Sequence, residues 1–289
     1  MKKYPLKEAP FDILNLTLML IVLLGMMYPF WYVLVYSISD ASSASSGLFL
    51  WPAKISFDSY VTILKSSDIL NGLWISSLRA ILGAFTMIVV SSMTAYAMSK
   101  DHLPGIKGIR KFILFSMYVS GGLIPTYMVI KGLGLTNTFA VYILPGMASV
   151  FNIILIRAYM ENLPPSLEES AYIDGANDFQ IFRSIVLPLS KPVIAAVSLY
   201  TAVGQWNSYI DTQIYNYRNP DLYPLQYILF NYLAAYTPSR EAAKMHIMTV
   251  TPYSMKMAIT IVTILPILFV YPFLQRYFIS GLLVGSVKA

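Results

Sequence analysis

The sequence contains no cysteine and few charged residues, and both absences narrow the possible functions. Without cysteine, the chain can have no disulfide framework, no thiol nucleophile and no Cys-ligated metal. Only 12% of its 289 residues are Asp, Glu, Lys or Arg, whereas soluble domains carry about 25% because a packed core needs a charged exterior. A chain this poor in charge cannot cover a soluble surface, so its composition predicts a membrane protein.

The sequence also lacks the groups that a catalytic or nucleotide-binding site would need. It has no G-x-x-x-x-G-K-[ST] stretch, so it cannot hold the phosphates of ATP in a P-loop. Its two histidines, His102 and His246, lie far apart, which argues against a metal site. It has no Ser–His–acid set and no pair of carboxylates within an apolar segment. We therefore expect no catalytic residue, no metal and no cofactor bound by this chain.

Long apolar runs make up most of the chain, of which 57% is hydrophobic. A helix crosses about 30 Å of hydrocarbon in about 20 residues, and helices satisfy their own backbone hydrogen bonds in lipid. Six such segments predict six transmembrane helices in an all-α fold, forming one domain over residues 13–279. The segments are residues 13–38, 69–98, 112–130, 132–156, 192–210 and 257–275. Gly121-Gly122 and Pro145-Gly146 predict kinks in the third and fourth of them.

Lysine and arginine are distributed unevenly between the connecting segments. With the N-terminus inside, twelve of these residues fall in inner segments and seven in outer segments, while Arg79 lies within a predicted span. Basic residues favour the cytoplasmic side, so we expect both termini in the cytoplasm. Residues 1–12 and 164–188 are then inside, and residues 211–256 form an extracytoplasmic loop. The net charge of +6 is explained by this topology, and no nucleic acid partner is expected.

The predicted cytoplasmic segment 164–188 contains a spaced pattern. It reads E-S-A, three residues, G, nine residues and then I-x-L-P. The pattern is formed by Glu169, Ser170, Ala171, Gly175, Ile185, Leu187 and Pro188, with Asp174 directly before the glycine. The small Ala171 and Gly175 are expected where a partner surface comes close. Without a partner, the same residues would form an amphipathic hairpin lying on the bilayer surface.

Local rules predict the structure of this segment. Ser166 and Glu169 have the spacing of a capping box, and Gly175 can take the left-handed conformation that closes a helix. Asn177 can cap a second helix, which Pro188 is expected to end. The segment is therefore predicted to form two short helices joined by a tight turn.

The spaced pattern resembles the loop by which membrane subunits of binding-protein-dependent ABC importers engage their ATPase, with Ser170 as the one departure. The segments Trp206-Asn207 and Leu222-Tyr223-Pro224-Leu225-Gln226 are further similar to the carbohydrate-uptake branch of that family. Within the branch, the resemblance is to polysaccharide and complex-oligosaccharide permeases. The resemblance implies a permease subunit in the bacterial cell membrane, with a coupling loop between its fourth and fifth helices.

The same resemblance implies a set of partners. A second permease subunit would pair with this chain as a heterodimer, two ATPase subunits would bind ATP and Mg²⁺, and an extracytoplasmic solute-binding protein would deliver a carbohydrate. Membrane lipid would surround the spans. The alternative solutes are polyols and sugar phosphates. A stand-alone secondary carrier would need coupling-ion carboxylates within spans or internal repeats, and we see neither in the sequence.

Residues near the outer end of the fifth predicted helix are candidates for contact with the solute. Gln205 and Asn207 are costly in lipid, so each is expected to face a polar path or a partner helix. Trp206 and Tyr209 either stack on sugar rings or belong to the interfacial aromatic belt. Arg79 is either a contact in the translocation path or a side chain that reaches toward the membrane surface.

Overall fold

Regular structure in the described part of the chain is helical. The computed structural model describes residues 9–40, 50–52, 54–234 and 251–282, within which extended segments meet only in an isolated antiparallel bridge between Ser39 and Ile55. Its elements are α1 (Ala9–Ser37), α2 (Asp58–Lys65), α3 (Ser67–Ser99), α4 (Ile106–Tyr118), α5 (Leu123–Gly132), η1 (Phe139–Tyr142), η2 (Leu144–Gly146), α6 (Val150–Met160), α7 (Pro165–Ile173), α8 (Asp178–Ile181), η3 (Phe182–Val186), α9 (Leu187–Leu189), α10 (Lys191–Asn207), α11 (Ile210–Tyr215), η4 (Pro220–Leu222), α12 (Leu225–Ala234) and α13 (Pro252–Leu282). Parts of the expected N-terminal segment (1–8) and outer loop (235–250) lie outside the described residues.

Three helical segments are long and apolar enough to cross a membrane without a break: Pro10–Ser37, Ser67–Ser99 and Tyr253–Val270. Three further pairs of helices qualify if each bent pair counts as one crossing, which gives up to six among the described residues. The all-α membrane fold is therefore confirmed, and the number of six crossings stays a prediction.

The bend in each of the three helix pairs lies at or next to an identifiable residue: Gly122, Pro145 or Ser190. α4 and α5 meet at 116° around Gly122, whose φ of 82° lies in the left-handed region that glycine adopts without strain. The 46° bend before α6 follows Pro145, which lies in η2. The 77° bend between α9 and α10 lies at Ser190. The kinks expected at Gly121-Gly122 and Pro145-Gly146 are thus present.

The predicted spans 112–130 and 132–156 are not continuous helices. α5 runs on to Gly132, and the chain then passes through the two 3-10 helices η1 and η2 before α6 begins. The fifth span is predicted to reach residue 210, but α10 stops at Asn207 because Ser208 is extended, with ψ of 133°. These boundaries depend on proline, positive-φ glycine and long-range contacts, which hydropathy does not register.

The chain divides into two compact units, residues 1–67 with 231–265 and residues 68–230 with 266–289. In the first unit, the side chains of α1 from residue 10 to 27 are exposed and mostly apolar, as expected of a helix in lipid. The end of α1 is held by polar and aromatic contacts. Ser37 Oγ lies 2.6 Å from Tyr60 Oη, and the rings of Tyr36 and Tyr253 meet edge to face at 4.7 Å.

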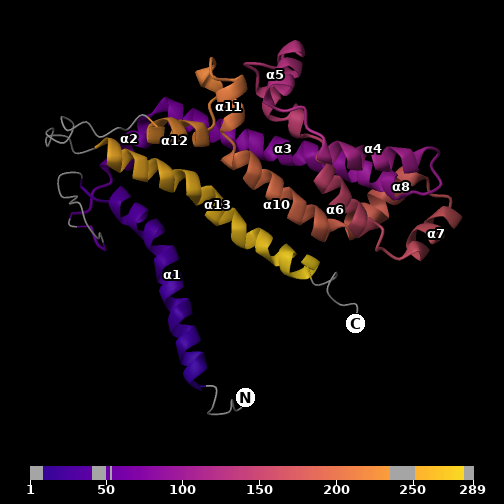
Figure 1. Ribbon diagram of the computed structural model, residues 1–289, viewed down its shortest axis with the longest axis horizontal. Helices are drawn as coiled ribbons and strands as arrows, with labels where there is room; N and C mark the ends of the chain where they lie inside the picture. The colour runs from indigo at the N-terminus through magenta and orange to yellow at the C-terminus, as the bar shows by residue number, and fades with distance from the viewer. Residues whose placement is uncertain (1–8, 41–49, 53, 235–250, 283–289) are drawn as a thin grey trace. The chain divides into compact units, whose positions relative to one another are not determined.

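The second unit has its main core where the end of α3 meets the predicted coupling segment. This cluster contains Met87, Ala95, Tyr96, Met98, Ile106, Ile153, Ile156, Met160, Ala171, Ile181, Phe182, Val186, Val193 and Val197. Figure 1 shows α4, α6, α7 and α8 gathered at this end of α3. A smaller cluster contains Ile75, Ile130, Val141 and Tyr142 and lies near the N-terminal end of α3. There α5 lies beside α11 (Figure 1). Both clusters therefore lie within the second unit.

Candidate translocation cavity and coupling loop

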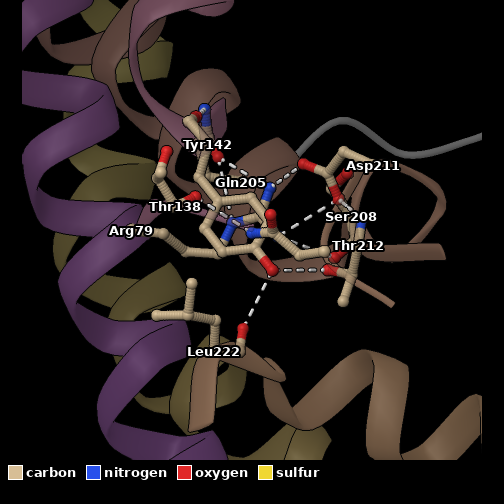
Figure 2. A network of polar contacts seen from close by, with 9 residues as sticks. Arg79, Thr138, Tyr142, Gln205, Ser208, Asp211, Thr212 and Leu222 are labelled. Atoms are coloured by element: carbon tan, nitrogen blue, oxygen red, sulfur yellow. Dashed lines mark hydrogen bonds and ion pairs between the residues drawn. The ribbon is translucent and has the colours of Figure 1, made fainter. Parts of the chain in front are cut away.

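Arg79 is buried within α3, with 1% of its surface exposed. Its Nε and Nη2 donate to Gln205 Oε1 at 3.2 and 3.0 Å, and its Nη1 donates to the carbonyl oxygen of Ser208 at 3.2 Å. The guanidinium also pairs with the Asp211 carboxylate through both Nη atoms, and its Cζ lies 4.3 Å from the ring centroid of Tyr142. Figure 2 shows these groups converging on Arg79. The positive charge is thus balanced within the chain.

The Arg79 network joins elements that are far apart in the sequence. Arg79 belongs to α3, Gln205 to α10 and Asp211 to α11. Gln205 Nε2 donates to the carbonyl oxygen of Tyr142 at 3.1 Å, and Tyr142 Oη donates to the carbonyl oxygen of Leu222 at 2.8 Å (Figure 2). A buried charge is tolerated only when it is paired and hydrogen-bonded. The network therefore fixes the break between α10 and α11 against α3 and η1.

Gly83 leaves the space that the Gln205 side chain occupies. It lies one helical turn after Arg79 on α3, and a Cβ built there would sit 2.9 Å from three Gln205 side-chain atoms. The Gln205 amide cannot move away freely, because it bonds both Arg79 and the Tyr142 carbonyl. The network therefore requires a glycine at position 83.

The network forms one wall of a cavity of about 400 Å³. The cavity is lined by Arg79, Met87, Thr126, Ile130, Val141, Tyr142, Pro145, Gly146, Ser149, Asn152, Thr201, Gly204, Gln205, Ser208, Asp211 and Tyr215. The Arg79–Asp211 pair supplies the charged groups of this lining, and they balance each other. The other polar groups are hydroxyls, amides and backbone, beside apolar side chains. Such a lining can bind a solute that is rich in hydroxyl groups.

Of the five residues predicted for the substrate path, Arg79 and Gln205 line this cavity and the other three do not. Trp206 points into the protein interior, with 7% of its surface exposed. Asn207 is exposed, and the ring of Tyr209 stacks on a phenylalanine of α12 at a centroid distance of 4.7 Å. Contact of these three residues with a solute stays a prediction.

Asp211, Tyr142 and Gly83 belong to the site but do not stand out in the sequence. One signal does point to Asp211, because a charge within a span needs a partner of opposite sign. Asp211 follows directly after the predicted span 192–210 on the expected outer side, but Asp68 stands equally close to the predicted span 69–98, so this signal does not single out Asp211. Tyr142 and Gly83 carry no comparable signal, since their roles depend on contacts between helices.

The expected coupling segment begins with the short helix α7. This helix starts at Pro165 and has no side-chain cap, so the predicted capping box of Ser166 and Glu169 is wrong. Proline fits the first turn because the first N–H groups of a helix have no partner within it. α7 closes at Gly175, whose φ of 83° confirms the predicted left-handed helix end.

The second helical stretch begins with its predicted cap and passes through Pro188. The Gln180 N–H donates to Asn177 Oδ1, and the Asn177 N–H donates to Gln180 Oε1, both at 2.9 Å. Capping by Asn177 is therefore confirmed. Pro188 does not end the stretch, because Phe182–Val186 forms a π-helix and α9 continues to Leu189. In this arrangement Pro188 occupies the first turn of α9, where a missing N–H is tolerated.

The residues of the spaced pattern are divided between surface and interior. Glu169, Ser170, Asp174, Gly175 and Pro188 are exposed, Ile185 and Leu187 are partly buried against the core, and Ala171 is buried. The expectation that Ala171 meets a partner is therefore corrected, because its methyl group packs against this chain. Tyr172, Ile173 and Phe179 expose 43%, 87% and 59% of their surfaces beside the pattern. Exposed apolar side chains can form an interaction surface, and docking of a partner at this segment stays a prediction.

Helices that can cross a membrane, a cavity lined by polar and apolar groups and an exposed helical loop are features of a multi-span transport protein. The family described as "Binding-protein-dependent transport system inner membrane component" matches residues 11–284. The chain belongs to this family of ABC transporter permeases, which are transport components of the inner membrane.

Several relatives match over nearly the whole chain. The "Polygalacturonan/rhamnogalacturonan transport system permease protein YtcP" of Bacillus subtilis (strain 168) is 36% identical over 287 residues, which cover 98% of this chain and all of the relative. The "Arabinooligosaccharides transport system permease protein AraQ" of the same organism is 29% identical, covering 98% of this chain and 99% of the relative. A solved structure of "a bacterial ABC transporter involved in the import of the acidic polysaccharide alginate" matches with a TM-score of 0.89 and 30% identity, over 96% of this chain and 100% of that chain.

Proposed function

We propose that this permease imports a carbohydrate, either an oligosaccharide or a polysaccharide fragment, that an extracytoplasmic solute-binding protein delivers. The observation that carries the proposal is the cavity, whose hydroxyl, amide and backbone groups complement sugar hydroxyls. Two relatives named for the transport of polygalacturonan and arabinooligosaccharides, and a similar structure from an alginate importer, support the same class of solute. Among the predicted substrate-path residues, Arg79 and Gln205 are the stronger candidates because they line the cavity. Trp206, Asn207 and Tyr209 remain candidates from the sequence.

The coupling loop is proposed to dock on a separate ATPase subunit. Its exposed members, Glu169, Ser170, Asp174, Gly175 and Pro188, would meet the partner. Ile185 and Leu187 would hold the loop to the core. A short helix with exposed apolar side chains is a suitable element for a groove on a partner.

The proposed assembly contains a second permease subunit, forming a heterodimer with this chain, and two ATPase subunits that bind ATP and Mg²⁺. The chain lies in the bacterial cell membrane with both termini in the cytoplasm, as the distribution of basic residues favours. ATP hydrolysis is then carried out entirely by the partner subunits.

Substrate-stimulated ATP hydrolysis by the assembled complex tests the proposed solute. The complex and its binding protein would be reconstituted in proteoliposomes and offered oligogalacturonides, arabino-oligosaccharides, a polyol and a sugar phosphate. We expect one of the two oligosaccharide classes to stimulate hydrolysis and to accumulate inside. Stimulation by the polyol or the sugar phosphate alone would contradict the proposal.

A further inference from the structure

An ion pair connects the end of α3 to the expected coupling helix α7. Lys100 directly follows the last residue of α3, and Glu168 lies in the first turn of α7. The Lys100 ammonium pairs with Glu168 Oε2, and the two side chains are only 13% and 23% exposed. Within the described residues, this is the ion pair that joins α7 to another element. A pair so withdrawn from water is stronger than one on the surface.

The surroundings of Lys100 come from several elements. Its Nζ lies 4.4 Å from the ring centroid of Tyr96 on α3, and Tyr172 of α7 donates its hydroxyl to Asp178 of α8. Burial lowers the pKa of Lys100 below its ordinary value, and the Asp178 carboxylate partly offsets this shift. One lysine therefore faces two carboxylates, Glu168 and Asp178, from the two helices of the coupling loop.

Besides the ion pair, Tyr172 connects α7 to Asp178 of α8 and to Tyr96 of α3. Ala171 is the one buried residue of α7, and most of its remaining side chains are exposed. The end of α3, by contrast, is anchored. Arg110 of α4 donates its Nε to the carbonyl oxygen of Met98 at 2.8 Å and pairs with Asp101 at 2.6 Å. Lys100 thus extends from a fixed helix end toward a helix that exposes most of its side chains.

We propose that Lys100 and Glu168 are positioning residues that lock α7 to α3, so that a movement imposed on α7 by the ATPase is transmitted along α3. This inference rests on the proposed docking of the coupling loop. α3 is a continuous helix of 33 residues without proline, and Arg79 lies 21 residues before Lys100, which is about 32 Å along a helix. The same rigid element therefore carries the contact with the coupling loop and the wall of the cavity.

The test measures how much solute is transported for each ATP hydrolysed. The reconstituted wild-type complex, with a binding protein loaded with oligogalacturonides, is compared with Lys100→Gln, Glu168→Gln, Lys100→Arg and the charge exchange Lys100→Glu with Glu168→Lys. The control variants, Arg157→Gln and Glu161→Gln, break a pair that is more exposed, at 23% and 40%, and that lies one turn apart at the end of α6. Coupling free energies of 1–3 kcal/mol correspond to about 5- to 150-fold effects. In Lys100→Gln and in Glu168→Gln, the amount of solute transported per ATP should therefore fall at least about fivefold.

Basal hydrolysis and assembly of the complex should stay near wild type in these variants. Lys100→Arg should retain coupling, and the charge exchange should recover part of what each neutral variant loses. The α6 variants should couple normally. Equal coupling in wild type and Lys100→Gln would overturn the positioning role, as would failure of Lys100→Arg to assemble, which would indicate a purely structural residue. The proposed function fails differently, because then the wild-type complex itself shows no stimulation by any solute of the panel.

Discussion

Arg79 shows how a single charge can be kept within a membrane helix. Its donors are directed to Gln205, to the Ser208 carbonyl and to Asp211, and its flat face rests on Tyr142. Because the guanidinium is engaged by protein groups in this way, we infer that it acts on a solute mainly through the wall that it holds in place. The cost of burying the charge is offset by this complete set of partners.

Removing the counter-ion of Arg79 should destabilise the protein. Asp211→Ala leaves the buried guanidinium unpaired, which costs about 3–5 kcal/mol for a buried pair. The double variant Arg79→Met with Asp211→Leu should lose less, because no uncompensated charge remains. Thermal unfolding of the purified complex compares the variants. If the double variant were less stable than Asp211→Ala, the Arg79–Asp211 pair would not be the main interaction of either residue.

Gly204 allows the cavity to be filled without disturbing its wall. It lines the cavity, and a Cβ built there meets no atom within 4 Å. Gly204→Ala should therefore stabilise α10 by about 0.5–1 kcal/mol, since alanine is the better helix former. Gly204→Leu should fold normally and lower uptake, because its side chain extends into the path.

Gly25→Leu serves as the control for Gly204→Leu, since Gly25 of α1 is equally open but lies outside the cavity. Uptake and thermal unfolding would be measured on the same preparations. Wild-type uptake by Gly204→Leu would show that the solute does not pass through this cavity.

Among the elements, the turn after α7 is the one whose geometry depends most on a single residue. Gly175 has φ of 83° and open space around it, so Gly175→Val adds backbone strain of about 1–2 kcal/mol and a bulky group on the expected docking surface. Substrate-stimulated ATP hydrolysis should be lost while membrane insertion is retained. Gly105→Val is a matched control, because Gly105 has φ of 78° and open space but lies outside the coupling loop. Equal stimulation in Gly175→Val and wild type would contradict docking by this loop.

The elements that were predictable from the sequence are those set by local chemistry. The left-handed turn at Gly175, the cap at Asn177 and the breaks at Gly121-Gly122 and Pro145-Gly146 each follow from residues within a few positions of one another. The membrane fold could also be predicted, from apolar runs and low charge, because hydropathy depends only on the residues within a local window.

The features that could not be predicted depend on distant partners. Arg79 and Asp211 are 132 positions apart, and no pattern in either neighbourhood specifies their pairing. The end of α10 at Asn207 belongs with this network, because the carbonyl of the following Ser208 accepts from Arg79. Ala171 was expected at a partner surface, but its small size serves the packing of α7 against its own core.

For the molecule as a whole, the central claim is that residues 164–188 form the surface on which the ATPase docks. The chain has no cysteine, so a single introduced thiol reports on one position. Ile173 is 87% exposed on α7, and Gln213 is exposed on α11 in the expected outer loop. Both positions can therefore be labelled in otherwise unchanged protein.

The most direct measurement is cross-linking of the assembled complex through Ile173→Cys and, separately, Gln213→Cys, with a short thiol-to-amine reagent. The account expects Ile173→Cys to link to the ATPase subunit, and Gln213→Cys to react only with reagents added from outside. A Gln213→Cys link to the ATPase, with none from Ile173→Cys, would contradict both the docking surface and the orientation of the chain.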